Sequence, residues 1–374
     1  MGANEQQIQE KYTKVKCATS KTRTSGWRPT VTSNPKKIMN KDENNIKSVN
    51  KNLILFVILT FAISWPIWYS SGVLSRGDFF IYDSKWLIAQ IGVFAPSLSA
   101  LIISSFHSKK LRWNGLRFLS IFVLIFIAGK IITLTSPKSI YDFSQTISII
   151  VIIIGLTSLL FFSSLNKRLL IPGSGKSQVK SRAKMIMLAV LGFPLLFLLV
   201  WFIVNIHGHS WSVSSLKNGH SFFLAFLLTV FFMNMILGGS IGEESGWRGF
   251  ALPLLLKKYS PVEASIILGL ITAVWHIPID ISNDFLQAIG AIVIRIVWSF
   301  SLSIIFTWFF LKTGGSLLIA IIFHTAINIL PDIGFSRYEQ AILILTVPLI
   351  IVSFSISHRL STKNQLIIKG TSKN

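Results

Sequence analysis

Two adjacent acidic residues, Glu243 and Glu244, lie within a long hydrophobic segment of this 374-residue chain. The chain has only 14 acidic residues, and none occurs between Asp142 and Glu243. A carboxylate placed inside a membrane segment costs free energy, so an acidic residue there is a functional candidate by default. Such a carboxylate can act as a general base that removes a proton from water.

Spacing gives the two glutamates different roles. Glu244 and Arg248 are four residues apart, so in a helix they share one face and can form an ion pair. Glu243 points about 100° away around the same helix and is left free for chemistry. The alternative is a purely structural ion pair, which would need one glutamate and not two.

Three glycines recur at intervals of four residues through the same segment, namely Gly238, Gly242 and Gly246. They predict a stripe of small residues along which another helix can approach closely. Ser240 lies between two of them in a Gly-x-Ser-x-Gly pattern. That pattern provides a nucleophile only at a turn between a strand and a helix, which a continuous hydrophobic helix does not offer.

Two of the 7 histidines, His276 and His324, lie within other hydrophobic segments. His324 and Asn328 are four residues apart, so they share a helix face. A single buried histidine is commonly structural, whereas two histidines and an asparagine near a pair of glutamates favour a functional cluster. These residue types supply a general base and hydrogen-bond donors that can stabilise a developing negative charge.

The depths of these residues in the membrane are compatible with one site. At 1.5 Å per residue, Glu243 lies about 20 Å from the basic end of its segment. His276 and His324 lie about 21 Å and about 14 Å from the starts of theirs. Because the three segments start from the same side of the membrane, their side chains can meet near the middle of the bilayer.

Three other polar residues lie in hydrophobic segments. Arg295 lies deep in its segment, where it either pairs with a carboxylate or the substrate, or extends its guanidinium toward the interface. Lys130 is close to the end of its segment and is expected to extend outward. Asn234 is expected to hydrogen-bond between helices.

The elements that position these residues are transmembrane helices. Hydrophobic residues make up 51% of the chain and charged residues only 13%, whereas soluble domains carry about 25% charged residues. Apolar runs of about 18 residues or more recur, so we predict an all-α, polytopic transmembrane helical bundle of about ten spans. The spans are expected near residues 53–73, 86–106, 116–134, 146–165, 185–206, 222–256, 262–281, 285–311, 315–330 and 341–357.

The 36 lysine and arginine residues, which give a net charge of +22, lie mostly between the hydrophobic segments. Every second loop is the basic one, and the positive-inside rule then places both termini in the cytoplasm. A basic face on a folded soluble domain, which nucleic-acid binding would need, is not visible in the sequence. Cys17 is the single cysteine, so an intrachain disulfide and a cysteine-based metal site are excluded.

The chain divides into four regions. Residues 1–51 are polar and basic with no helical period, so we expect a disordered tail. Residues 52–210 hold the first transmembrane helices and no recognised motif, while residues 222–330 carry the chemistry-bearing residues. Residues 331–374 are expected to form the last transmembrane helix and a basic cytoplasmic tail. The lysine- and isoleucine-rich composition favours a multi-pass protein of the bacterial plasma membrane, with the lipid bilayer as its partner.

At these residues the chain resembles the CAAX-protease and bacteriocin-processing family (CPBP, Abi-like) of intramembrane endopeptidases. The family pattern is Glu-Glu-x-x-x-Arg, then Phe-x-x-x-His, then His-x-x-x-Asn. The matching residues here are Glu243, Glu244, Arg248, His276, His324 and Asn328. Thr272 stands where phenylalanine is usual in the second motif. Three ordered motifs within four consecutive spans make the resemblance specific, although any one of them alone would be weak.

The resemblance implies a mechanism for peptide-bond hydrolysis. Glu243 would activate a water molecule as the general base, helped by His276. His324 and Asn328 would stabilise the oxyanion of the tetrahedral intermediate. Glu244, paired with its arginine, would orient the first helix of the site.

Members of this family have been described both as metalloproteases and as glutamate proteases. Two histidines and two glutamates can hold a zinc ion with an open position, and the ligands would then be Glu243, His276 and His324. The His-Glu-x-x-His motif of zinc peptidases does not occur in this sequence. This favours a glutamate mechanism without a metal cofactor, and a zinc-dependent mechanism stays open as the alternative.

The expected substrate is a membrane-associated peptide or protein, such as a peptide pheromone or a bacteriocin precursor. Two other functions stay open. One is a non-catalytic bacteriocin-immunity or membrane peptide-binding protein, because proteins resembling this family are linked to immunity. The other is a proton-coupled transporter, because buried glutamate and histidine also form proton relays. A single compact polar cluster without an apparent inverted repeat argues against the transporter.

Overall fold

The structure is a computed structural model, and it describes residues 35–71, 84–107, 127, 177–206, 223–236, 238–280, 285–333 and 338–371. The elements in these ranges are all helices, as the sequence predicts, and no strand occurs among them. The chain divides into two compact units, residues 1–47 and 48–374, and the predicted site residues belong to the second.

The helices differ widely in length, and the three shortest, α9, η5 and α10, follow one another in the middle of the chain. Their bounds are α2 Pro35–Ser71, α3 Ser84–Val93, α4 Ala95–His107, α7 Ser177–Asn205, α8 Phe223–Ile236, α9 Ser240–Gly246, the π-helix η5 Trp247–Ala251, α10 Leu252–Leu255, α11 Pro261–Asp280, α12 Phe285–Lys312, α13 Leu317–Ile333 and α14 Tyr338–Thr371.

Within the described residues, 6 helical segments are long and apolar enough to cross a membrane. The span expected at 86–106 consists of the two short helices α3 and α4, and the span at 315–330 is the short helix α13. The spans expected at 116–134 and 146–165 lie outside the described residues, as does Lys130. The total of about ten spans and the cytoplasmic placement of both termini therefore stay predictions.

The range predicted as a disordered tail, residues 1–51, overlaps helix α2, which begins at Pro35. Proline suits the first turn of a helix, where its missing N–H would have no helical partner. The polar residues that follow continue directly into the first hydrophobic span, so one helix covers both. The remainder of the predicted tail, residues 1–34, lies outside the described residues.

The continuous helix predicted over 222–256 is wrong, because the chain turns between α8 and α9. Gly239 has a φ of 97°, a left-handed conformation that glycine adopts without steric cost. The amide of Gly238 donates to the carbonyl of Met233 at 3.1 Å, and the amide of Glu243 donates to the carbonyl of Gly239 at 2.7 Å. The first hydrogen bond ends α8 and the second starts α9, so Glu243 lies in the first turn of a new helix.

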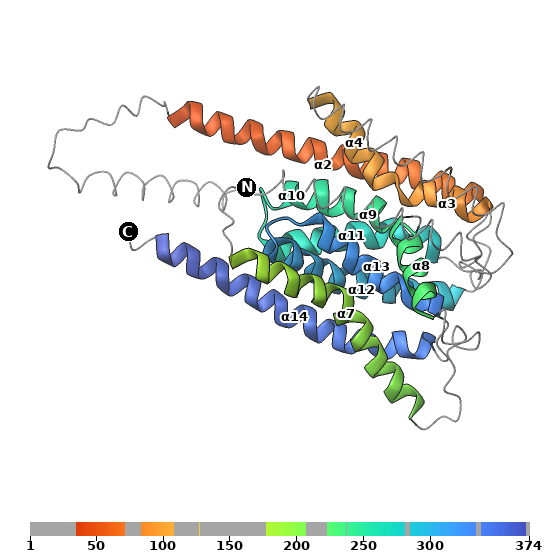
Figure 1. Cartoon of the computed structure of the whole chain (residues 1–374). Coiled ribbons are helices and arrows are strands. Elements are labelled where there is room, and N and C mark those ends of the chain that lie inside the picture. Colours follow the sequence, from red (N-terminus) through yellow and green to blue (C-terminus); the bar gives the residue numbers. More distant parts are fainter. Residues whose placement is uncertain are drawn as a thin grey trace. The chain divides into compact units, whose positions relative to one another are not determined.

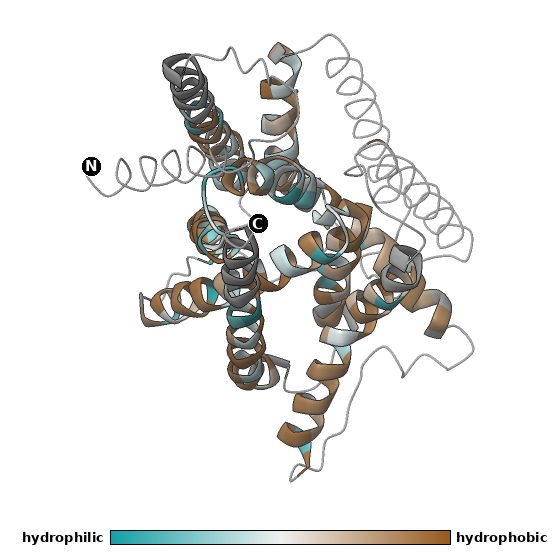
Figure 2. Cartoon of the chain, turned by 90° about the vertical axis from the view of Figure 1, so that its left-hand side faces the viewer, coloured by the Kyte–Doolittle hydropathy of each residue, from teal (hydrophilic) through white to brown (hydrophobic). Residues whose placement is uncertain are grey.

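The segment Phe226–Leu255 is the most buried of the candidate spans, with 71% of its apolar window inside the structure against 22–44% for the others. Helices α4, α8 and α13 all contact α9, while α11 packs along α12, and α12 along α14 (Figure 1). Figure 2 shows hydrophobic residues along the long helices, and α7 exposes Leu191, Leu195 and Phe202. Apolar residues on the outside suit a bundle surrounded by lipid, with the segment that carries Glu243 at its centre.

Candidate active site

Glu244 joins two helices of the site through one carboxylate oxygen. Its Oε1 accepts a hydrogen bond from Arg248 Nη1 at 2.9 Å and lies 2.8 Å from Nδ1 of His324. The side chain of Glu244 is fully buried. The predicted i, i+4 pair with Arg248 is therefore present, and the same carboxylate also reaches α13, which the spacing alone does not indicate.

Arg248 lies in the π-helix η5, directly after α9. The centre of its guanidinium group is 3.8 Å from the centre of the Phe306 ring on α12. A cation over an aromatic face is stabilised by the charge distribution of the ring. The π-helical turn adds a residue to this part of the helix, and its arginine contacts both Glu244 and α12.

Glu243 is nearly as buried as its neighbour, with 8% of its surface exposed. Its carboxylate makes no hydrogen bond or ion pair with any residue that the structure describes. It does interact electrostatically with His324, Glu244, Arg248 and Arg295. An acidic group that is buried, surrounded by charges and not engaged in a hydrogen bond is available to a water molecule or a substrate.

His276 is held in one orientation by its own helix. Its Nδ1 lies 2.7 Å from the carbonyl oxygen of Thr272, and its ring packs edge-on against Trp275 with centroids 4.7 Å apart. A carbonyl only accepts, so Nδ1 carries the proton and Nε2 of the neutral ring has a free lone pair. His276 can therefore accept a proton at Nε2. Thr272, the departure from the family pattern, contributes a backbone carbonyl that any residue type would supply.

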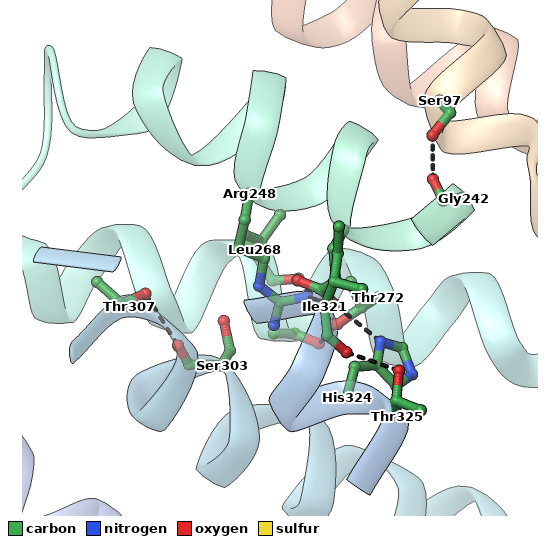
Figure 3. Close-up of polar contacts among 12 residues, drawn as sticks. Ser97, Gly242, Arg248, Leu268, Thr272, Ser303, Thr307, Ile321, His324 and Thr325 are labelled. Atoms are coloured by element: carbon green, nitrogen blue, oxygen red, sulfur yellow. Dashed lines mark hydrogen bonds and ion pairs between the residues drawn. The ribbon is translucent and has the colours of Figure 1, made fainter. Parts of the chain in front are cut away.

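His324 and Asn328 lie one turn apart on α13, as the spacing predicts. Nδ1 of His324 lies 2.8 Å from Oε1 of Glu244, so Nε2 lies on the opposite side of the ring from that contact. Asn328 Nδ2 donates to the carbonyl oxygen of Gly238 at 3.4 Å, at the break between α8 and α9. Figure 3 shows Arg248, Thr272 and His324 gathered where these helices meet.

Arg295 forms a two-pronged ion pair with Asp280. Its Nε and Nη2 each lie 2.8 Å from one carboxylate oxygen of Asp280. Of the two possibilities that the sequence leaves open, pairing with a carboxylate is therefore the one observed. Asp280 was not among the residues predicted from the sequence, although Asp280 follows His276 by four residues in a hydrophobic helix. Arg295 also interacts electrostatically with His276, so the ion pair borders the site.

Two other hypotheses about this region can be compared with the geometry. Within the described residues, no group of three histidine, cysteine or acidic side chains is placed to hold a metal ion, and a zinc site formed by Glu243, His276 and His324 stays a prediction. Ser240 is completely buried, and its hydroxyl has no hydrogen-bond partner among the described residues. No base is therefore in position to activate Ser240 as a nucleophile.

Comparison with known proteins finds the same region. Residues 221–330 match the family described as Rce1-like, type II CAAX prenyl endopeptidase. Over 130 residues the chain is 36% identical to the CAAX prenyl protease 2 of Methanococcus maripaludis. That alignment covers 33% of this chain and 46% of the relative, so the chain spans about half the length of the relative that it matches. All six residues of the three motifs lie within the matched region.

Proposed function

We propose that this chain, which belongs to the CAAX-protease family through residues 221–330, is an intramembrane endopeptidase that hydrolyses membrane-associated peptides or proteins. The observation that carries the proposal is the buried Glu243 carboxylate, which no described residue engages in a hydrogen bond. It interacts electrostatically with His324 in a helical bundle with segments long and apolar enough to cross a membrane. Because a carboxylate inside a membrane segment costs free energy, one that no described residue binds is a candidate for proton transfer.

In the proposed reaction, Glu243 takes a proton from a water molecule, and the hydroxide attacks the carbonyl carbon of the scissile bond. His276 assists through Nε2, which the hydrogen bond at Nδ1 leaves free. The tetrahedral intermediate carries its negative charge on the former carbonyl oxygen. Asn328 and Nε2 of His324 stabilise that oxyanion, and the proton returns to the leaving amine as the C–N bond breaks.

The pair of Glu244 and Arg248 orients other residues of the site and does not itself exchange protons with the substrate. Glu244 is fully buried and shared between Arg248 and His324. A carboxylate between two donors fixes the ring of His324 and stabilises its doubly protonated form, in which Nε2 also carries a proton that it can donate to the oxyanion. Glu244 and Arg248 therefore set the direction of α9 and of the His324 ring, while Glu243 performs the proton transfer.

We propose a mechanism that needs no zinc, because the His-Glu-x-x-His motif of zinc peptidases does not occur in the sequence. The proposal is supported by the described residues, among which no three acidic, cysteine or histidine side chains are grouped to hold a metal ion. Cleavage should continue after the protein is purified with a chelator and metal-free buffers. Loss of cleavage that is restored by added zinc, and by no other step, would contradict this part of the proposal.

The proposed substrate is a peptide or protein held at the membrane, and the proposed location is the bacterial plasma membrane. The name of the archaeal relative refers to a prenylated substrate. Bacteria generally lack prenylation, so peptide pheromones and bacteriocin precursors are proposed here in its place. Comparison of the peptides released by cells with and without this protein would identify the substrate.

Separate measurements of binding and cleavage distinguish an endopeptidase from a protein that only binds peptides. The full chain would be reconstituted in vesicles with quenched fluorescent peptides, prenylated and unprenylated. Glu243→Gln is expected to retain peptide binding and to lose cleavage by about 10²-fold or more. Glu263→Gln is the matched control, because it makes the same change of residue type at the start of α11, outside the three motifs. Equal cleavage by both variants, or no cleavage by the unchanged protein, would contradict the proposed function.

A further inference from the structure

Two side chains from the N-terminal helices bind the backbone next to the proposed catalytic residues. Ser97 Oγ on α4 donates to the carbonyl of Gly242, which directly precedes Glu243 (Figure 3). Trp65 Nε1 on α2 donates at 3.2 Å to the carbonyl of Trp275, which directly precedes His276. Both donors lie outside residues 221–330, the region that matches the protease family.

The contact between α4 and α9 is close enough to exclude any side chain at two positions. A Cβ at Gly242 would lie 2.8 Å from the ring of Phe94, and one at Gly246 would lie 2.4 Å from backbone and side-chain atoms of Pro96. These two glycines of the predicted stripe therefore meet a neighbouring helix, as expected. The close packing brings the Ser97 hydroxyl to the Gly242 carbonyl.

The contact between α2 and α11 holds both the backbone and the ring of Trp275. Its Nε1 donates to Ser64 Oγ at 2.7 Å, while its carbonyl accepts from the neighbouring Trp65. The Ser64 hydroxyl in turn lies 2.8 Å from the carbonyl of Gly92. Ser64 and Trp65 of α2 therefore both bind Trp275, and the Trp275 ring packs against the ring of His276.

Both proposed catalytic residues lie where their own helix is weak. Helix α9 has only 7 residues between a glycine turn and a π-helix. Helix α11 contains Pro278 two residues after His276, and proline removes the N–H that would bond to the carbonyl four residues earlier. Hydrogen bonds from other helices can replace the rigidity that these segments lack.

We propose that Ser97 and Trp65 are positioning residues that fix Glu243 and His276 for catalysis. This inference rests on the proposed function and gives α2 and α4 a part in it. A displacement of about 1 Å at a reacting group can cost about 10²-fold in rate. Loss of either hydrogen bond is expected to lower kcat by about tenfold, because each fixes one of the two residues.

Matched substitutions separate this role from general packing. Ser97→Ala is compared with Ser99→Ala, since Ser99 lies on the same helix, is fully buried, and has no hydrogen-bond partner among the described residues. Trp65→Phe is compared with Trp298→Phe, which removes an indole N–H on α12 that bonds to the Thr346 hydroxyl on α14. Ser97→Thr retains the hydroxyl and should restore most of the activity that Ser97→Ala loses.

The measurements are kcat, KM, the thermal midpoint, and deuterium exchange of the full chain in lipid nanodiscs. Ser97→Ala and Trp65→Phe should lower kcat with little change in KM, and the two control variants should change neither. Exchange should rise over 240–246 in Ser97→Ala and over 272–280 in Trp65→Phe, but not in the controls.

The two claims can fail separately. If each variant matches its control in both kcat and exchange, the positioning role is wrong. A fall in activity that only follows the thermal midpoint, with no recovery in Ser97→Thr, would overturn it as well. If the unchanged chain cleaves nothing, the proposed function fails, and deuterium exchange alone then decides whether Ser97 and Trp65 fix these backbone segments.

Discussion

At the scale of single residues, Glu243 and Glu244 are neighbours with opposite surroundings. Glu244 shares one oxygen between Arg248 and His324, whereas Glu243 has no hydrogen-bond partner among the described residues. A buried charge that lacks a partner destabilises the fold, and a buried charge that completes a pair supports it. The two glutamates should therefore respond differently to the same substitution.

Replacing each glutamate by glutamine tests that difference. Glu244→Gln leaves the Arg248 charge buried without its carboxylate, and breaking a buried pair costs about 3–5 kcal/mol. Glu243→Gln removes a charge that has no such pair, so the free energy of unfolding should stay the same or rise. Thermal unfolding in one detergent compares the two variants. Equal destabilisation by both would show that the roles assigned to them are wrong.

Arg295 offers a second test at this scale, because its charge borders both Glu243 and His276. Arg295→Lys keeps the charge but loses the two-pronged geometry toward Asp280, so most activity should remain. Arg295→Met removes the charge and should lower kcat by about tenfold, which corresponds to about 1.4 kcal/mol. Equal kcat values for the lysine and methionine variants would indicate that the charge has no part in the reaction.

Sequence reasoning identified the candidate residues but not all of their partners. The four-residue spacing correctly predicted the pair of Glu244 and Arg248. It did not predict that His324 binds the same carboxylate, because contacts between helices depend on how the helices are rotated. Asp280 was missed although an acidic residue within a membrane segment is itself a signal.

At the scale of elements, the glycine stripe shows what the sequence predicts well and where it is incomplete. Gly242 and Gly246 contact α4, as the stripe predicts, but a Cβ at Gly238 would meet Asn234 of the preceding helix. The turn at Gly239 and the π-helix η5 were not predicted, since a hydrophobic run of this composition is equally compatible with a straight helix. These two irregularities orient α9 relative to α13.

The contact between α4 and α9 predicts different effects for two glycine-to-alanine substitutions. Gly246→Ala places a methyl group 2.4 Å from Pro96, where backbone atoms cannot move aside easily. Such overpacking costs about 1–3 kcal/mol, so the thermal midpoint should fall. At Gly249 the nearest atoms are 3.7 Å away, so Gly249→Ala should be tolerated. Equal midpoints for the two variants would contradict the close packing of α4 on α9.

At the scale of the whole molecule, the membrane bundle follows from composition, because half of the residues are hydrophobic and few are charged. The described helices include 6 candidate spans and two shorter apolar helices. The number of spans and their direction depend on residues 108–176 as well, most of which the structure does not describe. Only the alternation of basic loops predicts that both termini share the cytoplasmic side.

Cys17, the single cysteine, allows that orientation to be measured without further substitutions. A membrane-impermeant maleimide should label Cys17 in inverted membrane vesicles and not in intact cells. A cysteine introduced at Ser372, in a variant that lacks Cys17, should show the same pattern. Labelling of the two sites from opposite sides would mean an odd number of spans and would overturn the predicted topology.

The central claim is that Glu243 activates water to cleave a peptide bond within the bundle. The most direct test is cleavage in water enriched in ¹⁸O, followed by mass spectrometry of the product with the new carboxyl terminus. The unchanged protein should yield a product that carries one heavy oxygen, and Glu243→Gln should yield at least about 10²-fold less of it. Equal labelled product from Glu243→Gln would contradict the claim.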